Sequence, residues 1–178
     1  EKIIDPTING LKKIGCPYTG FLYAGLMIKN NEPKLIEYNI RFGDPECQVL
    51  MMRLENDLLD LIIAAKENKL NTMSIKWKKE SCITIVAASK GYPNKYKKNT
   101  EIRNLEEVKN DANSQMFHAG TIKKDNRIFA IGGRVLNSTS MGSSLLEARK
   151  KSIEMLNLIG WEEIYFRKDI GWRIVDKK

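Results

Sequence analysis

A strand that runs directly into a helix start constrains this chain more than any other feature. Residues 35–46 read LIEYNIRFGDPE, with polar residues at 37, 39 and 41 and apolar residues at 36, 38 and 40. Alternation with a period of two is typical of a β-strand with one polar and one apolar face. Asp44-Pro45-Glu46 then has the residue types of a helix N-terminus. We therefore expect a strand over Leu35–Arg41 that leads at once into a helix.

The remaining patterns predict an α+β fold of two domains. A strand over 21–28 forms a hairpin with 35–41, and a helix over 46–69 breaks near 55–57. Later segments predict strands at 81–88, 114–119, 128–131, 132–136 and 161–167, with a helix from Ser143 or Ser144 to about 159. Residues 70–80 are polar and show no regular spacing of apolar residues. We therefore place the boundary between the two domains in this segment. The expected domains are 1–75 and 76–178.

Composition excludes several classes of protein. The chain of 178 residues has no apolar run near the roughly 20 residues that a membrane helix needs, so no membrane partner is expected. Its three cysteines are far apart and lack a C-x-x-C pair, which favours reduced thiols and a cytoplasmic location. The net charge of +8 could attract nucleic acid, but a solvated lysine-rich surface is the simpler interpretation.

The polar face of the expected strand carries an unusual set of side chains. Glu37, Asn39 and Arg41 occupy positions i, i+2 and i+4, which point to one side of a strand. A carboxylate and an amide oxygen suit Mg²⁺, which completes its shell with water or phosphate oxygens. The guanidinium of Arg41, two residues further along the strand, could form two hydrogen bonds to the phosphate groups that the cation binds. The set predicts a nucleotide-triphosphate site, although the polar outer face of an edge strand would show the same spacing.

Two other positions leave alternatives open. Arg134 follows Gly132-Gly133, where backbone and guanidinium could meet a phosphate, or where a bulged strand could carry a surface arginine. His118 is either an acid–base group or a hydrogen-bonded structural histidine.

Gly43 permits a close approach of the backbone to a ligand, and the N-terminus of the expected helix that follows it could bind an anion.

In order along the chain, PYTGFLYAGLMI, EYNIRFGDPE, FHAGT, GGRVL and RKDIGWR resemble the C-terminal half of the phosphoribosylamine–glycine ligase family of the ATP-grasp superfamily. The resemblance covers nearly the whole chain. It implies the end of an ATP-grasp core followed by a small mixed α+β C-terminal domain. It also implies an enzyme of de novo purine synthesis that joins glycine to 5-phosphoribosylamine through a glycyl phosphate, at the expense of ATP.

The resemblance also assigns roles to residues. It implies that Glu37 and Asn39 bind Mg²⁺ (or Mn²⁺), and that Arg41 is catalytic because it steadies the transferring phosphoryl group. Asp44 and Glu46 are expected to contact an ammonium group or sugar hydroxyl, although capping alone would explain an Asp at 44. Arg134 is included among the expected substrate-binding residues.

Other interpretations and partners follow from the same comparison. The family's N-terminal domain and the lobe that clamps adenine precede the matched region, so the expected partner is this missing N-terminal portion. We expect no ligase turnover from the 178 residues alone. The alternatives are another purine-pathway ATP-grasp carboxylase or formyltransferase, and a non-catalytic basic module that binds nucleic acid through Lys76–Lys79 and Lys95–Lys98.

Overall fold

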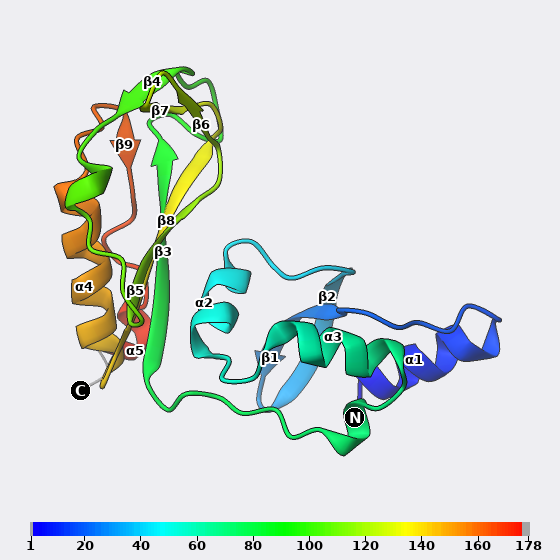
Figure 1. Cartoon of the computed structure of the whole chain (residues 1–178). Coiled ribbons are helices and arrows are strands. Elements are labelled where there is room, and N and C mark those ends of the chain that lie inside the picture. Colours follow the sequence, from blue (N-terminus) through cyan, green and yellow to red (C-terminus); the bar gives the residue numbers. More distant parts are fainter. Residues whose placement is uncertain (1, 176–178) are drawn as a thin grey trace. The chain divides into compact units, whose positions relative to one another are not determined.

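The computed structural model describes residues 2–175 and contains two compact units (Figure 1). The first unit comprises residues 1–44 and 54–77, and the second comprises 45–53 and 78–178. The chain therefore passes between the units after Asp44, after Arg53 and after Trp77. The expected domains, 1–75 and 76–178, differ from these units in two places: residues 45–53 lie in the second unit, and residues 76 and 77 lie in the first.

The first unit is built around a hairpin. Its strands are β1 (Tyr23–Lys29) and β2 (Glu32–Asn39), which pair antiparallel. Asn30 and Asn31 join them with φ of 52° and 60°, the left-handed backbone that a tight hairpin turn needs. The other elements of the unit are α1 (Ile4–Lys13), α3 (Leu58–Lys66) and the 3₁₀ turn η1 (Leu70–Thr72).

The hairpin differs from the expected strand in its end and in its apolar face. β2 stops at Asn39, so Arg41 lies in a bend beyond it. Tyr38 is partly buried and its hydroxyl contacts that of Thr7 on α1. Ile36 and Ile40 are 64% and 75% exposed, however, which contradicts a buried apolar side. Alternation predicts which side chains share a face, but it does not say what covers that face.

The second unit contains two antiparallel sheets. The larger has the order β5-β8-β3-β9, and the smaller has the order β4-β7-β6. The bounds of these strands are β3 (Ser81–Ser89), β4 (Thr100–Ile102), β5 (Ser114–His118), β6 (Thr121–Lys124), β7 (Arg127–Ala130), β8 (Arg134–Gly142) and β9 (Ile164–Tyr165). The helical elements are α2 (Glu46–Arg53), η2 (Leu105–Glu107), α4 (Leu145–Leu158) and α5 (Trp172–Val175). None of the helices within residues 2–175 has the length and apolarity needed to span a bilayer.

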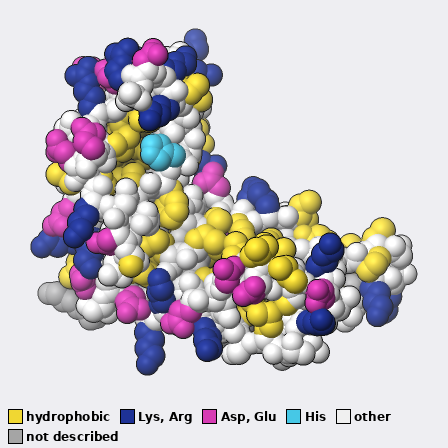
Figure 2. All heavy atoms as spheres, viewed as in Figure 1, with side chains coloured by type: hydrophobic (Ala, Val, Ile, Leu, Met, Phe, Trp, Pro, Cys, Tyr) yellow, Lys and Arg dark blue, Asp and Glu magenta, His cyan; other side chains and the backbone are white. Residues whose placement is uncertain are grey.

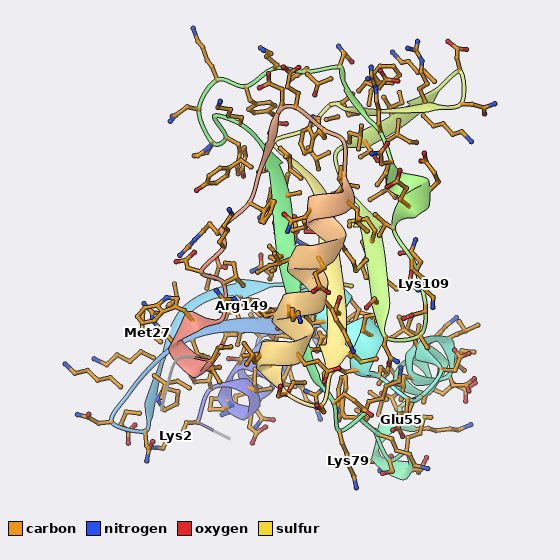
Figure 3. The ribbon with its side chains drawn as sticks, turned by 90° about the vertical axis from the view of Figure 1, so that its left-hand side faces the viewer. Lys2, Met27, Glu55, Lys79, Lys109 and Arg149 are labelled. Carbon is orange, nitrogen blue, oxygen red and sulfur yellow. The ribbon has the colours of Figure 1, made fainter. Side chains whose placement is uncertain are left out.

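The core of the second unit lies between the larger sheet and α4. Figure 3 looks onto α4, which runs along the sheet in front of β3 and β8 and packs against both. Ile85 and Leu136 on the sheet and Leu156 on the helix are at most 1% exposed, and Trp161 closes the core with its Nε1 donating to Thr100 Oγ1 at 2.9 Å. Burial of such side chains contributes about 1.5–3 kcal/mol each, so this layer supplies much of the unit's stability.

The opposite face of the same sheet carries both polar and apolar buried side chains, among them Thr139, Asn137 and Met141. In the register of β3 and β8, Thr84 pairs with Thr139 and Val86 with Asn137. The two threonine hydroxyls hydrogen-bond at 2.8 Å, while α2 packs against both strands from this side. The run NSTS within β8 is buried throughout, which a pattern of polar residues does not predict.

Local capping explains where two of the helices begin. Asp57 Oδ1 accepts a hydrogen bond from Leu59 N at 2.7 Å, which starts α3 at the predicted break. Ser144 Oγ accepts from Glu147 N at 3.2 Å, which confirms one of the two predicted caps of α4. The Glu147 carboxylate accepts from both the backbone N (2.8 Å) and Oγ (2.6 Å) of Ser143, and it pairs with Lys151 at 2.7 Å. This arrangement differs from a capping box in that the Glu147 carboxylate accepts from Ser143, one residue before the cap, and it is extended by the ion pair with Lys151.

The cap of α4 predicts a pH-dependent stability. The hydrogen bonds from Lys151 and Ser143 lower the pKa of Glu147 from 4.5 to about 2. A carboxyl group whose pKa is lower in the folded state stabilises the fold above its unfolded pKa, and this contribution is lost as the pH falls toward the folded pKa. We expect Glu147→Gln to lower the melting temperature of the second unit at pH 7, with the difference shrinking between pH 4.5 and pH 2. Thermal unfolding followed by circular dichroism checks this.

Glu154→Gln is the matched control on the same helix, because Glu154 makes only an exposed contact with Lys150 at 3.9 Å. It should change the melting temperature less than Glu147→Gln does. An unchanged difference between Glu147→Gln and the parent at pH 2.5 and pH 7 would contradict the assignment.

Candidate functional site

The first group of candidate residues lies at the end of β2. Asn39 Nδ2 donates to Glu37 Oε1 at 3.2 Å, so the two side chains are neighbours on one face of the hairpin. The Glu37 side chain is exposed. Its partner across the hairpin is Gly25, where an added Cβ would lie 3.0 Å from Glu37 Cγ. Gly25 therefore provides the space in which the Glu37 side chain lies against β1.

These two side chains can hold a divalent cation together. An exposed carboxylate and a carboxamide oxygen are the ligands that Mg²⁺ prefers, and two protein ligands leave room for water or phosphate. Within residues 2–175, no three or more His, Cys, Asp or Glu residues form a group that could hold a metal ion. The described residues thus fit a two-ligand oxygen site better than a closed cage of the zinc type.

Arg41 is separated from this pair by the end of the strand. Its guanidinium Nη1 donates to the carbonyl of Phe42 at 2.8 Å, and the side chain is exposed. Phe42 packs on Phe21, with ring centroids 4.1 Å apart, which anchors the bend to the segment before β1. The bend is thus held by its aromatic residue, and the guanidinium is placed along the bend rather than over the strand face.

Asp44 and Glu46 fall on either side of the first passage between the units. Asp44 is exposed and is the last residue of its stretch of the first unit, whereas Glu46 begins α2 in the second. Glu46 Oε2 is buried and, among the described residues, has no hydrogen-bond donor. Burial and the neighbouring Glu46 charge both raise the pKa of the Cys47 thiol. Glu46 is therefore an acidic group at a helix N-terminus with unused accepting capacity.

Arg134 begins β8 and lines a cavity of ≈ 350 Å³ within the second unit. The other residues that line it are Pro45, Thr84, Val86, Ala88, Tyr92, Tyr165, Phe166, Arg167 and Ile170. Sequence reasoning did not single out Tyr92 or Arg167. Arg167 is the first residue of the run RKDIGWR, which carried part of the family resemblance, so this run could have pointed to it. Tyr92 lies in a segment that the sequence predicts only as a turn, and nothing there marked it as a site residue.

The glycines before Arg134 have a packing role. An added Cβ at Gly120 would lie 2.6 Å from Arg134 O and 2.7 Å from Gly132 Cα, so the FHAGT and GGRVL segments touch through their backbones. A Cβ at Gly133 would lie 2.1 Å from the Tyr92 ring. Ser89 N donates to Gly133 O at 2.8 Å and Ser89 Oγ to Gly132 O at 2.8 Å. The glycine pair thus fixes the position of Arg134 through contacts within the protein.

His118 lies at the end of β5 with a local partner. Its Nδ1 is 3.0 Å from Thr121 Oγ1 at the start of β6, and the side chain is exposed. This contact closes the turn between two strands. It favours the structural interpretation of His118 over an acid–base role.

Lysine and arginine side chains gather at the end of the second unit that carries β4, β6 and β7 (Figure 2). Several are in ion pairs: Lys97 with Glu163 at 2.6 Å, and Arg103 with Glu101 at 2.8 Å. Arg127 approaches the same Glu101 at 3.8 Å. Of the two clusters of lysines and aromatics named from the sequence, one has its aromatic residue, Trp77, in the first unit, and the other has its aromatic residue, Tyr96, in the second.

Comparison with known proteins gives consistent matches along the chain. The family model "Phosphoribosylglycinamide synthetase, C domain" matches residues 82–173, and "Phosphoribosylglycinamide synthetase, ATP-grasp (A) domain" matches residues 1–47. A phosphoribosylamine–glycine ligase of Brucella melitensis is 50% identical over the whole chain, which spans 42% of that relative. The chloroplastic phosphoribosylamine–glycine ligase of Arabidopsis thaliana is 48% identical, with 34% of its length covered.

A solved structure gives the same result. The crystal structure of phosphoribosylamine–glycine ligase from Thermotoga maritima matches with a TM-score of 0.82 and 30% identity, over 94% of this chain and 41% of that one. The chain thus spans about two fifths or less of the length of the relatives described here.

The backbone contact before Arg134 predicts a strong effect of one methyl group. Gly120→Ala forces a Cβ against backbone atoms that cannot turn away, so we expect a loss of roughly 1–3 kcal/mol of unfolding free energy. Urea unfolding of the second unit measures it. Gly10→Ala in α1 is the control, because nothing lies within 4 Å of its added Cβ and alanine favours a helix. An unchanged unfolding midpoint for Gly120→Ala would refute the tight packing.

Proposed function

The chain belongs to the phosphoribosylglycinamide synthetase family, and on that premise we propose that it carries part of the active site of a phosphoribosylamine–glycine ligase. The supporting observation is the Glu37–Asn39 pair on β2, a carboxylate and a carboxamide side by side on a strand within the match to the ATP-grasp domain. The names of the family models and of the relatives favour this ligase over a carboxylase or formyltransferase of the same superfamily.

The proposed reaction has two steps. The carboxylate of glycine attacks the γ-phosphorus of ATP, which releases ADP and forms glycyl phosphate. The amine of 5-phosphoribosylamine then attacks the acyl carbon, phosphate leaves, and the nitrogen loses a proton as the amide forms. In such phosphoryl transfers the protein contributes positioning and charge neutralisation more than covalent chemistry.

The residues of the first unit serve the first step. Glu37 and Asn39 would hold a divalent cation, Mg²⁺ or Mn²⁺, against the triphosphate, and that cation supplies neutralisation of the phosphate charge. Arg41 would exchange its bond to the Phe42 carbonyl for one to a phosphate oxygen. A charge-assisted hydrogen bond to phosphate is stronger than one to a neutral carbonyl, which favours that exchange when a triphosphate is present.

The residues around the first passage between the units serve the second step. Asp44 and Glu46 would accept hydrogen bonds from an ammonium group or sugar hydroxyl, and the Glu46 Oε2 atom, which has no donor among the described residues, supports that role. Arg134 would bind the substrate. We also propose a cytoplasmic location, a reducing compartment in which Cys16, Cys47 and Cys82 would stay as free thiols.

The role of the Glu37–Asn39 pair can be tested in a chimera. The part of the Brucella melitensis ligase that this chain does not cover is joined in front of residues 1–178, and ADP release that requires both glycine and 5-phosphoribosylamine is measured. We expect an active chimera, and a loss of roughly 100-fold or more in kcat for Glu37→Gln, because one cation ligand is gone. The concentration of Mg²⁺ needed for half-maximal rate should also rise.

Glu32→Gln is the matched control for this experiment. Glu32 lies on the same strand but pairs with Lys2 at 3.0 Å on an exposed surface. Its replacement should leave the rate and the Mg²⁺ dependence unchanged. Full activity of Glu37→Gln, or an equal loss for Glu32→Gln, would count against the proposed metal site.

The proposal also predicts the behaviour of the purified 178-residue chain. We expect no glycine-dependent release of ADP, because its partner in the proposal is the remainder of the ligase, which the chimera supplies. Measurable turnover by the chain alone would show that the described residues already contain a complete nucleotide site.

A further inference from the structure

We propose that an apolar groove along α3 in the first unit is the docking surface for the remainder of the ligase, and that this unit completes its hydrophobic core only when that polypeptide is bound. The inference rests on the proposed function for the identity of the partner, whereas the groove itself follows from the first unit alone. We call it the α3 groove. It has a volume of ≈ 560 Å³, and its main lining residues are Phe21, Leu61, Ile62, Ala65, Leu70 and Ile75.

The first unit has almost no buried interior. Among its described residues, 2–44 and 54–77, only Gly25 and Ala64 are buried. The first has no side chain, and the second contributes a single methyl group. The second unit, by contrast, buries a continuous apolar layer between its larger sheet and α4. Because a segment of this size needs a hydrophobic core or another staple to stay folded, the first unit depends on apolar contacts that it does not supply itself.

The composition of α3 is the clearest sign of a missing partner. Its sequence is LLDLIIAAK, so seven of its nine residues are apolar and they occur on all sides of the helix. Leu59, Ile62 and Ile63 are nevertheless 62%, 42% and 45% exposed. A surface helix normally carries apolar residues on one side only, and a helix that is apolar all round is normally buried. The sequence of α3 therefore suits a buried helix, although the first unit does not bury it.

The exposed apolar surface extends beyond the α3 groove. A second hollow of ≈ 480 Å³ shares Ala65 and Leu70 with the groove and reaches α1 through Ile4 and Ile8. Contiguous apolar surface of this kind is uncommon on monomeric soluble proteins and marks sites of interaction. The docking surface thus includes one side of α1 as well as α3.

The hairpin of the first unit is incomplete in the same sense. Among the described residues, β1 and β2 pair only with each other, which leaves the outer edge of each strand unpaired. Met27, Ile28 and Ile36 are exposed on these strands. A sheet of two strands is at best marginally stable in water, and an apolar edge invites pairing with a further strand. The hairpin therefore needs strands from a partner, as α3 needs apolar cover.

The comparisons favour the remainder of the ligase as that partner. The chain covers 42% of the Brucella melitensis relative, so more than half of that protein lies outside it. The ATP-grasp (A) domain model matches residues 1–47, which contain α1 and the hairpin. In the proposed ligase the remainder is joined in front of α1, which lines the apolar surface. A tethered polypeptide acts at an effective concentration in the millimolar range, far above that of a second copy of the chain.

Docking at the α3 groove also affects the candidate site. Phe21 lines the groove and packs on Phe42, and the carbonyl of Phe42 accepts the hydrogen bond from Arg41. An occupant that contacts Phe21 therefore restricts the bend that carries the guanidinium. In this way the docking that completes the core also fixes the position of Arg41.

Hydrogen exchange of backbone amides tests the proposal by comparing the 178-residue chain with the chimeric ligase. In the free chain, the α3 amides should exchange almost as fast as those of an unstructured peptide, because a helix of nine residues without apolar cover is marginal. In the chimera, the same amides should exchange about 100-fold more slowly. The amides of β3 and β8 should be protected in both proteins, since the second unit has its own core.

A protease site between the remainder and residue 1 of the chimera tests whether the interface holds without the tether. After cleavage, the two pieces should co-elute in gel filtration at ~1 μM, because an interface of ordinary size gives a Kd of that order or tighter. Ile62→Glu should weaken the association about tenfold or more, since it places a charge in the α3 groove. Leu146→Glu is the matched control, because it introduces the same charge at an exposed apolar position on a helix of the second unit, and it should leave the association unchanged.

Four results would overturn the proposal. The first is protection of the α3 amides in the free chain as strong as that of β8, which would show that the helix is already covered. The second is fast exchange of α3 in the chimera, and the third is separation of the cleaved pieces at ~1 μM. The fourth is an equal loss of association for Leu146→Glu. A free chain that elutes as a dimer with protected α3 amides would assign the groove to a second copy instead.

The chimera keeps this inference separate from the proposed function. An active chimera whose pieces separate after cleavage, or whose α3 amides exchange as in the free chain, would refute the docking surface and leave the ligase assignment intact. An inactive chimera would count against the ligase assignment, while hydrogen exchange and co-elution would still decide whether the remainder docks at the α3 groove.

Discussion

The antiparallel pairing of β3 with β8 is the interaction on which the second unit depends. The register runs from Ser81 opposite Gly142 to Ala88 opposite Arg134, with a bulge before its end. One face of this pair carries the apolar layer under α4, and the other carries α2 and the wall of the cavity that Arg134 lines. A shift of one residue would exchange the two faces, because side chains alternate along a strand. The same register that builds the core therefore also places Thr84 and Val86 in the wall of the cavity that Arg134 lines.

One short run of sequence contributes to both units. EYNIRFGDPE ends the hairpin with Glu37 and Asn39, turns through a bend held by Phe42 on Phe21, and then starts α2 in the second unit. The chain returns after Arg53 and leaves again after Trp77, where Leu54 and Trp77 form an isolated bridge within the first unit. The groups proposed for the cation and for the sugar are thus connected by only a few residues of chain, although they belong to different compact units.

Local patterns in the sequence predicted local features well. The caps of α3 at Asp57 and of α4 at Ser144 follow from the side chain and its own backbone, so no tertiary information was needed. Alternation placed Glu37 and Asn39 side by side. It failed for Arg41, because the strand ends two residues earlier, and it could not foresee that Ile36 and Ile40 are exposed. It also missed β6 and the buried NSTS run of β8, whose polar side chains are buried by tertiary packing from α2 and α4. The cavity that Arg134 lines is formed by residues from 45 to 170 and therefore could not be predicted from any single motif.

Gly25 has a consequence for protein engineering. The residue opposite Glu37 has no side chain, and the carboxylate-bearing chain occupies the space that a methyl group would take. Any larger residue introduced there would press on the Cγ of its neighbour across the ribbon without touching the acid group itself. Position 25 therefore offers a steric means of moving an oxygen donor by fractions of an ångström, with its chemical identity preserved.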